Sequence, residues 1–189
     1  MKNYRWVTIG CGDIAHQFAQ AMRQEGRTLY GVANRTYEKA AAFAEEYGIP
    51  RVYERISDVF TDENVDIVYI ATPHNTHSGY INEALRHGKH VLCEKAITLD
   101  IKELKEAQTL AEERGLVLAE AMTIYHMPLY KRLREIAESG ALGKLCMIQM
   151  NFGSFKEYDM TNRFFNPDLA GGALWDIGVY ALSFIRWFM

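Results

Sequence analysis

Hydrophobic and polar positions follow two different periods along the first 121 residues. Residues 65–71 (VDIVYIA) form a near-continuous apolar run, as expected of a strand buried on both faces. Ile14, Phe18 and Met22 recur at a helical spacing, and the Ala-rich run 37–47 is closed by a glycine, a usual end of a helix. The pattern predicts strands at 4–9, 28–33, 65–71, 90–93 and 116–121, and helices at 14–23, 37–47, 77–86 and 101–114.

This alternation of strands and helices predicts the class of the fold. Parallel strands joined by right-handed crossovers place helices on both faces of one sheet. We therefore expect an α/β domain with a doubly wound parallel sheet over residues 1–121.

The pattern changes after residue 121. A helix is expected at 128–137, a longer strand with alternating apolar positions at 144–155, and a second helix at 171–188. Residues 122–189 thus read as the N-terminal part of an α+β domain with a mostly antiparallel sheet. Because one strand cannot form a sheet, we expect a shortened form of a longer protein, or one completed by a partner chain.

Charge and composition exclude several partners. The formal net charge is −3 over 189 residues and no Lys/Arg-rich run occurs, so we expect no nucleic-acid partner. The apolar runs are short and interrupted by charges, so no membrane span is expected. The beginning of the chain has neither the apolar core nor the cleavage site of a secretory signal.

The cysteines and histidines indicate neither disulfides nor a metal. Cys11, Cys93 and Cys146 share no metal-type spacing, which favours reduced thiols in a cytoplasmic protein. His74 and His77 have no acidic or thiol partner nearby, so polar residues at a helix start are the simpler interpretation, and no metal site is expected.

The first strand is followed by a glycine loop. Gly10 permits a tight turn, Gly12 lets the backbone approach a pyrophosphate, and Ala15 takes the third small position; Asp13 and Ile14 open the helix. Free N–H groups and the positive end of the helix dipole would meet the phosphates. An ordinary strand-to-helix turn is the alternative, but the order strand, loop, helix, strand favours a dinucleotide site.

The end of the second strand bears on the choice of cofactor. NAD enzymes commonly place an acid there for the ribose hydroxyls, whereas this chain has Asn34 and Arg35, and no acid before Glu38. Arg35 would supply a cation where the 2′-phosphate of NADP lies. The pattern favours NADP, with NAD possible; a solvated arginine at a helix start is the alternative.

Three separated blocks match one pattern: 10–15 (GCGDIA), 71–77 (ATPHNTH) with Glu94-Lys95 after the next strand, and 171–180 (GGALWDIGVY). Together they resemble the Gfo/Idh/MocA oxidoreductase family over the whole chain. Within it, the pair Asp176 and Tyr180 is most similar to the dihydrodiol dehydrogenase and glucose–fructose oxidoreductase branches. The resemblance implies a Rossmann domain, a C-terminal domain with a mostly antiparallel sheet, and an active site between them.

The resemblance also implies roles for several residues. Thr72, Pro73 and His77 would line the nicotinamide side. Glu94-Lys95 would occupy the Glu-Lys-Pro position among the cofactor-binding residues, with Ala96 in place of proline, and Lys95 would reach both the cofactor and the substrate hydroxyl. Proline would fix the backbone that aims the lysine.

The implied chemistry is hydride transfer between nicotinamide and a hydroxyl or carbonyl carbon of a sugar, cyclitol or diol-like substrate. Lys95 and Tyr180 are the candidates for moving the proton, and Asp176, four residues before Tyr180, would orient Lys95 or bind a substrate hydroxyl. A surface lysine, a core tyrosine and a buried acid are the plain alternatives.

Two other functions stay open. The chain could be a truncated, inactive dinucleotide-binding module, or an interaction protein using its apolar end at 187–189. In its full-length form, the resemblance suggests a homo-oligomer.

Overall fold

A computed structural model describes residues 3–162 and 164–189. The chain divides into two compact units, one ending at Glu120 and one running from Ala121 to Met189.

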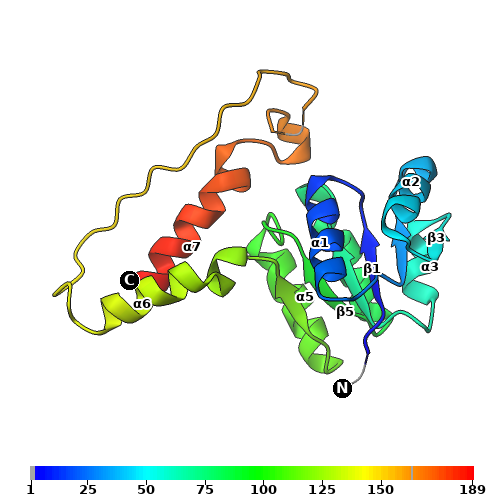
Figure 1. The fold of residues 1–189 in the computed structure, drawn as a ribbon, viewed down its shortest axis with the longest axis horizontal. Helices are drawn as coiled ribbons and strands as arrows, with labels where there is room; N and C mark the ends of the chain where they lie inside the picture. Colours follow the sequence, from blue (N-terminus) through cyan, green and yellow to red (C-terminus); the bar gives the residue numbers. More distant parts are fainter. Residues whose placement is uncertain (1–2, 163) are drawn as a thin grey trace. The chain divides into compact units, whose positions relative to one another are not determined.

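The first unit is built on one parallel sheet (Figure 1). Its six strands lie in the order β3-β2-β1-β4-β5-β6, and each paired neighbour runs parallel to the next. This order is that of a doubly wound Rossmann fold and confirms the predicted fold class. The strands are β1 (Trp6–Ile9), β2 (Gly31–Ala33), β3 (Arg51–Tyr53), β4 (Ile67–Ile70), β5 (His90–Cys93) and β6 (Leu118–Glu120).

Helices cover both faces of this sheet. Buried alanines and Phe43 on α1 (Asp13–Gln24) and α2 (Tyr37–Tyr47) pack with one face. The other face packs against α3 (Ile56–Thr61), α4 (His77–Arg86) and α5 (Ile101–Glu113). Burying the strands on both sides explains their continuous apolar runs.

Local signals place the ends of several helices. Gly48 closes α2 in the left-handed conformation, at φ 66°. Asp100 precedes α5, and its side chain accepts a hydrogen bond from the backbone N–H of Lys102. β3 and α3 are elements that the hydrophobic pattern did not predict.

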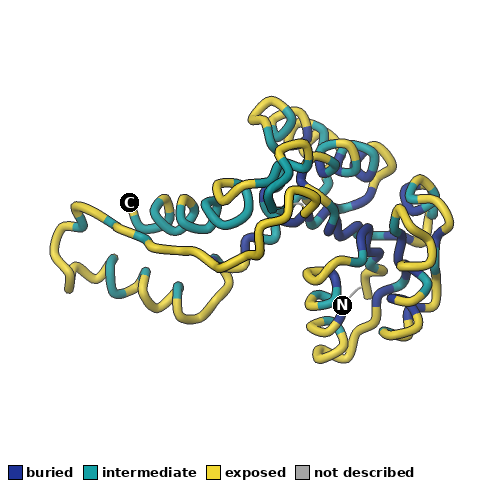
Figure 2. The backbone as a smooth tube through the Cα atoms, turned by 90° about the horizontal axis from the view of Figure 1, so that it is seen from above, coloured by how far each residue is buried: buried dark blue, intermediate teal, exposed yellow. Residues whose placement is uncertain are grey.

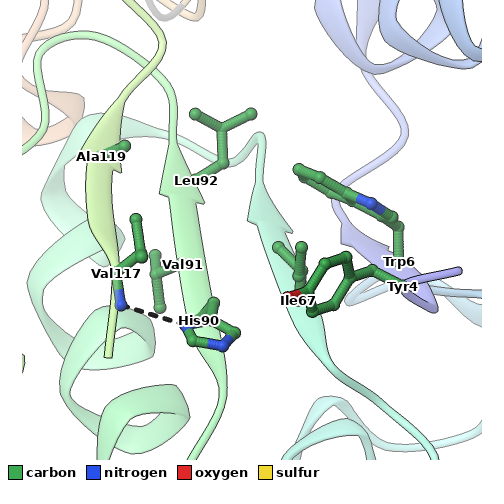
Figure 3. A pocket seen from close by; sticks show the side chains of 8 residues that line it. All are labelled: Tyr4, Trp6, Ile67, His90, Val91, Leu92, Val117 and Ala119. Atoms are coloured by element: carbon green, nitrogen blue, oxygen red, sulfur yellow. Dashed lines mark hydrogen bonds between the residues drawn. The ribbon is translucent and has the colours of Figure 1, made fainter. Parts of the chain in front are cut away.

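One part of the α1–α2 face carries an apolar hollow (Figure 3). Trp6, Ile67, Leu92 and Ala119 line it, and Trp6 and Leu92 also border the core that α1 and α2 bury. Beside them, His90 accepts a hydrogen bond at Nδ1 from the backbone N–H of Val117. The hollow includes the amino ends of β5 and β6 and so lies at the end of the sheet opposite to their carboxyl ends.

The regular secondary structure in the described part of the second unit is helical only. Its helices are η2 (Thr123–His126), α6 (Pro128–Glu138), η3 (Pro167–Leu169), the π-helical turn η4 (Leu174–Gly178) and α7 (Val179–Phe188). Figure 2 shows the second unit mostly intermediate and exposed, whereas the buried segments gather in the first.

The predicted strand at 144–155 is wrong. Most of this segment is exposed, and it has no regular secondary structure. A strand needs a neighbour to accept and donate its backbone hydrogen bonds, and the described residues of this unit provide none. The apolar alternation alone could not supply that neighbour.

The stretch Pro167–Phe188, which contains η3, η4 and α7, is long and apolar enough to cross a membrane by length and composition. The expectation that every apolar run falls far short of a span was therefore too strong. A core helix of a soluble domain passes the same test, so this feature is weak evidence for a membrane.

Candidate functional site

The carboxyl ends of the parallel strands bring the predicted cofactor residues of the first unit to one edge of the sheet. Gly10 follows β1, Asn34 follows β2, Thr72 lies two residues after β4, Glu94 follows β5, and Glu120 ends β6. The strand order reverses between β1 and β4: β2 and β3 lie on one side of β1, and β4, β5 and β6 lie on the other. Ligands of open α/β sheets bind at this switch point.

Gly10 fixes the turn out of β1. It has φ 105°, and its N–H donates to the carbonyl of Ala33 at the end of β2. A Cβ at this position would lie 2.2 Å from the carbonyl oxygen of Ala71. Only glycine fits this conformation and this close approach between the β1 and β4 connections.

Gly12 leaves open space at the start of α1. A Cβ added there would meet no heavy atom within 4 Å, and α1 has no side-chain cap. The first N–H groups of a helix have no partner within the helix, and they carry its positive end. The residues present therefore fit a dinucleotide, whose pyrophosphate Gly12 and the exposed first turn, with Asp13 and Ile14, would hold.

Two cations follow β2 in the sequence. Arg35 is exposed two residues after this strand, and the neighbouring Asn34 side chain donates to the carbonyl of Thr36 at 3.0 Å. Burial raises the pKa of the Cys11 thiol to about 11, and the charge of Lys39 opposes this shift. Lys39, in the first turn of α2, is thus a cation beside the glycine loop that the sequence analysis missed.

Hydrogen bonds among its own residues stabilise the connection after β4. The hydroxyls of Thr72 and Thr76 share a hydrogen bond of 2.7 Å, and Pro73 is exposed before η1 (His74–Thr76). His77 is fully buried, with Nε2 2.9 Å from the carbonyl oxygen of Thr72 and Nδ1 2.9 Å from that of Ala96. Its ring therefore bridges the backbones of two loops, and its expected place on the nicotinamide side stays a prediction.

The connection after β5 carries the predicted catalytic lysine. Glu94 is buried and accepts a 2.7 Å hydrogen bond from the hydroxyl of Tyr69. Lys95 is half-buried, and the Lys95–Ala96 peptide bond is cis. Burial raises the pKa of the Glu94 carboxyl, while the Tyr69 hydroxyl and the Lys95 charge oppose the shift.

Glu120 is an acid at this edge that the sequence analysis also missed. Its Oε1 accepts a 2.9 Å hydrogen bond from the N–H of Ile97, and burial raises the pKa of its carboxyl. The signal was available, because the predicted strand at 116–121 places an acid at its carboxyl end.

Asp176 and Tyr180 belong to the second unit. Asp176 lies in η4 and lines a hollow with Lys156, Phe165 and Ala173. Tyr180 is in the first turn of α7 and contacts Phe152 edge-on, with ring centroids 6.0 Å apart. The π-helical turn η4 leads directly into α7, and such turns are frequent at functional sites. Their pairing with Lys95 of the first unit stays a prediction.

The fold and the glycine loop define a Rossmann-type domain of the dinucleotide-binding class. The sequence matches the oxidoreductase family with an NAD-binding Rossmann fold (Gfo/Idh/MocA) over residues 4–122, and the C-terminal domain of that family over residues 130–189. The chain belongs to this family, as the sequence motifs predicted.

Relatives of this chain include dehydrogenases named for a diol and a sugar. The chain is 34% identical over 184 residues to trans-1,2-dihydrobenzene-1,2-diol dehydrogenase of Sus scrofa, covering 96% of this chain and 54% of the relative. It is 36% identical over 159 residues to D-xylose 1-dehydrogenase (NADP(+)) 2 of Haloferax volcanii, covering 84% and 48%. The chain thus spans about half the length of the curated relatives it matches.

A solved structure shows the same fold. The 3-ketoreductase KijD10 from Actinomadura kijaniata, in complex with NADP and TDP-benzene, matches with a TM-score of 0.85 and 29% identity. The match covers 99% of this chain and 57% of that one.

Proposed function

We propose that this chain carries the cofactor-binding part of an NAD(P)-dependent oxidoreductase. The enzyme transfers a hydride between nicotinamide and a hydroxyl or carbonyl carbon of a sugar, cyclitol or diol-like substrate. The observation that carries the proposal is the glycine loop, where Gly10 packs against the β4 connection and Gly12 leaves the start of α1 open. Family membership and the named activities of the relatives support it.

NADP is the proposed cofactor, and NAD is the alternative. Arg35 is exposed after β2, and Lys39 lies close enough to Cys11 to affect its pKa. Both cations suit a 2′-phosphate, which NADH lacks. The xylose dehydrogenase relative is named for NADP, and KijD10 was solved with NADP.

The chemistry divides between cofactor and protein. A bound nicotinamide would accept or deliver the hydride. Lys95 would hold the substrate hydroxyl, and Lys95 and Tyr180 would carry its proton, with Asp176 orienting the lysine or binding a second hydroxyl. The lysine lies at the sheet edge where such folds bind ligands, which supports its part in this scheme.

The first experiment compares fluorescence titrations of this chain with NADPH and NADH. We expect saturable binding that is tighter for NADPH. Arg35→Ala should weaken NADPH binding about tenfold, since a charge-assisted contact contributes roughly 1.5 kcal/mol, while NADH binding changes little. Arg27→Ala, which removes another exposed arginine, should change neither affinity. Equal losses for both cofactors in Arg35→Ala would refute its contact with the phosphate.

A second experiment tests Lys95. Lys95→Ala should reduce turnover of a responsive sugar, polyol or diol by at least about a hundredfold, the usual contribution of a proton-transferring group. NADPH affinity should change little, because Gly12 and the start of α1 hold the phosphates. An unchanged rate at saturating NADPH would remove Lys95 from the mechanism.

A truncated binding module is the second candidate, because the chain spans about half of its curated relatives. Tight NADPH binding without turnover of any tested substrate would favour it. A cytoplasmic location and a homo-oligomeric full-length form complete the proposal; the three free cysteines, Cys11, Cys93 and Cys146, support the first and the family resemblance supports the second.

A further inference from the structure

The Ala96–Ile97 peptide, one residue after Lys95, is held from two sides by residues that lie far from it in the sequence. On one side, the Nδ1 atom of His77 lies 2.9 Å from the carbonyl oxygen of Ala96. On the other, the Oε1 atom of Glu120 accepts a 2.9 Å hydrogen bond from the N–H of Ile97. Ala96 is buried between these contacts.

His77 extends this arrangement to the connection after β4. Its Nε2 atom lies 2.9 Å from the carbonyl oxygen of Thr72. Carbonyl oxygens only accept, so a neutral ring donates to one of the two carbonyls and a protonated ring to both. Because the ring is fully buried, one rigid group fixes the distance between the β4 and β5 connections.

Glu120 acts on Lys95 through charge as well as through the backbone. Burial raises the pKa of the Glu120 carboxyl, and the Lys95 charge lowers it. The other titratable groups that interact with it are Glu94 and Cys93, whose pKa values it raises. Burying an ionisable acid opposes folding. If Glu120 served only to accept the hydrogen bond of Ile97, the neutral amide of a glutamine would do so equally well.

We propose that Glu120 and His77 are positioning residues for Lys95: both hold the backbone that follows the lysine, and Glu120 also places a carboxyl group near its ammonium group. Glu120 ends β6 and His77 begins α4, two elements of the rigid sheet and its covering helices. Together they determine where the lysine side chain starts and which way it leaves the chain. This proposal rests on the proposed role of Lys95 in proton transfer.

The first test separates the backbone contact from the charge. Glu120→Gln keeps an oxygen that can accept from Ile97, whereas Glu120→Ala removes it. Hydrogen exchange of the Ile97 amide, followed by NMR, should be at least about tenfold faster in Glu120→Ala and nearly unchanged in Glu120→Gln. Glu113→Ala, an exposed acid at the end of α5, should leave Ile97 exchange unchanged. An unchanged rate in Glu120→Ala would overturn the backbone part.

The second test measures the electrostatic interaction between Lys95 and Glu120. The Glu120 carboxyl is titrated by 13C NMR in the original chain and in Lys95→Met, which removes the charge and keeps an unbranched side chain. The pKa of Glu120 should rise in Lys95→Met, because the ammonium that lowers it is gone. A merely structural acceptor would titrate alike in both proteins, and that result would overturn the proposal.

NADPH titration of the same samples separates this proposal from the proposed function. Failure of the original chain to bind NADPH would contradict the proposed function and leave both NMR results standing. Normal NADPH binding with unchanged Ile97 exchange and unchanged Glu120 titration would contradict only the positioning role.

Discussion

Gly10 and Gly12 lie two residues apart, yet a methyl group added at each would meet different surroundings. At Gly10 the backbone is at φ 105° and the methyl group would overlap the carbonyl of Ala71. At Gly12 the backbone is extended, at φ −85°, and the methyl group would face open space. The fold therefore requires the first glycine, whereas at the second it leaves room for a ligand to approach the helix.

This difference predicts opposite outcomes for two matched variants. Gly10→Ala should lower the free energy of unfolding by at least about 3 kcal/mol, from backbone strain and overlap together. Gly12→Ala should change it by less than about 1 kcal/mol but weaken NADPH binding about tenfold or more, because the methyl group occupies the pyrophosphate approach. Urea unfolding and NADPH titration measure the two effects. A Gly12→Ala variant that binds NADPH normally would contradict the assigned phosphate contact.

At the scale of elements, the sequence predicted best where local chemistry and burial agree. The helix at 37–47 and the strand at 90–93 have the predicted bounds, because a glycine stop and a short apolar run define them. The three residues of β3 are too short for a periodic signal, and their pairing with β2 comes from the sheet. The segment at 144–155 failed for the converse reason, since its apolar alternation lacks a neighbouring strand among the described residues.

The candidate site shows the same limit. The glycine loop was predictable, since its chemistry lies in consecutive residues. Hydrogen bonds between distant residues were not: no motif showed that the buried ring of His77 bonds to the backbones of Thr72 and Ala96. Its place on the nicotinamide side stays a prediction. The position of Glu120 at the end of a strand could be read from the sequence, but its contact could not, because its partner Ile97 lies 23 positions away. Motifs thus identify residues, whereas tertiary contacts assign their roles.

At the scale of the whole molecule, the buried residues are unevenly distributed. Both core clusters and all six strands lie in the first unit. Beyond Glu120, the fully buried apolar residues among those described are Met122 and Ile124. Burial of apolar surface is the main source of folding stability, so the first unit should contribute most of the free energy that stabilises the fold.

A shortened chain of residues 1–127 should therefore fold and bind the cofactor. It retains the sheet, its covering helices, Met122 and Ile124, and the glycine loop with Arg35 and Lys39. We expect one cooperative urea transition and an NADPH dissociation constant within about threefold of the original chain, because the phosphate contacts lie in this unit. The same shortened chain with Gly10→Ala is the control, and it should lose the cooperative transition. A 1–127 chain that lacks this transition would show that residues 128–189 stabilise the Rossmann unit, and that the buried residues of the first unit do not suffice to fold it.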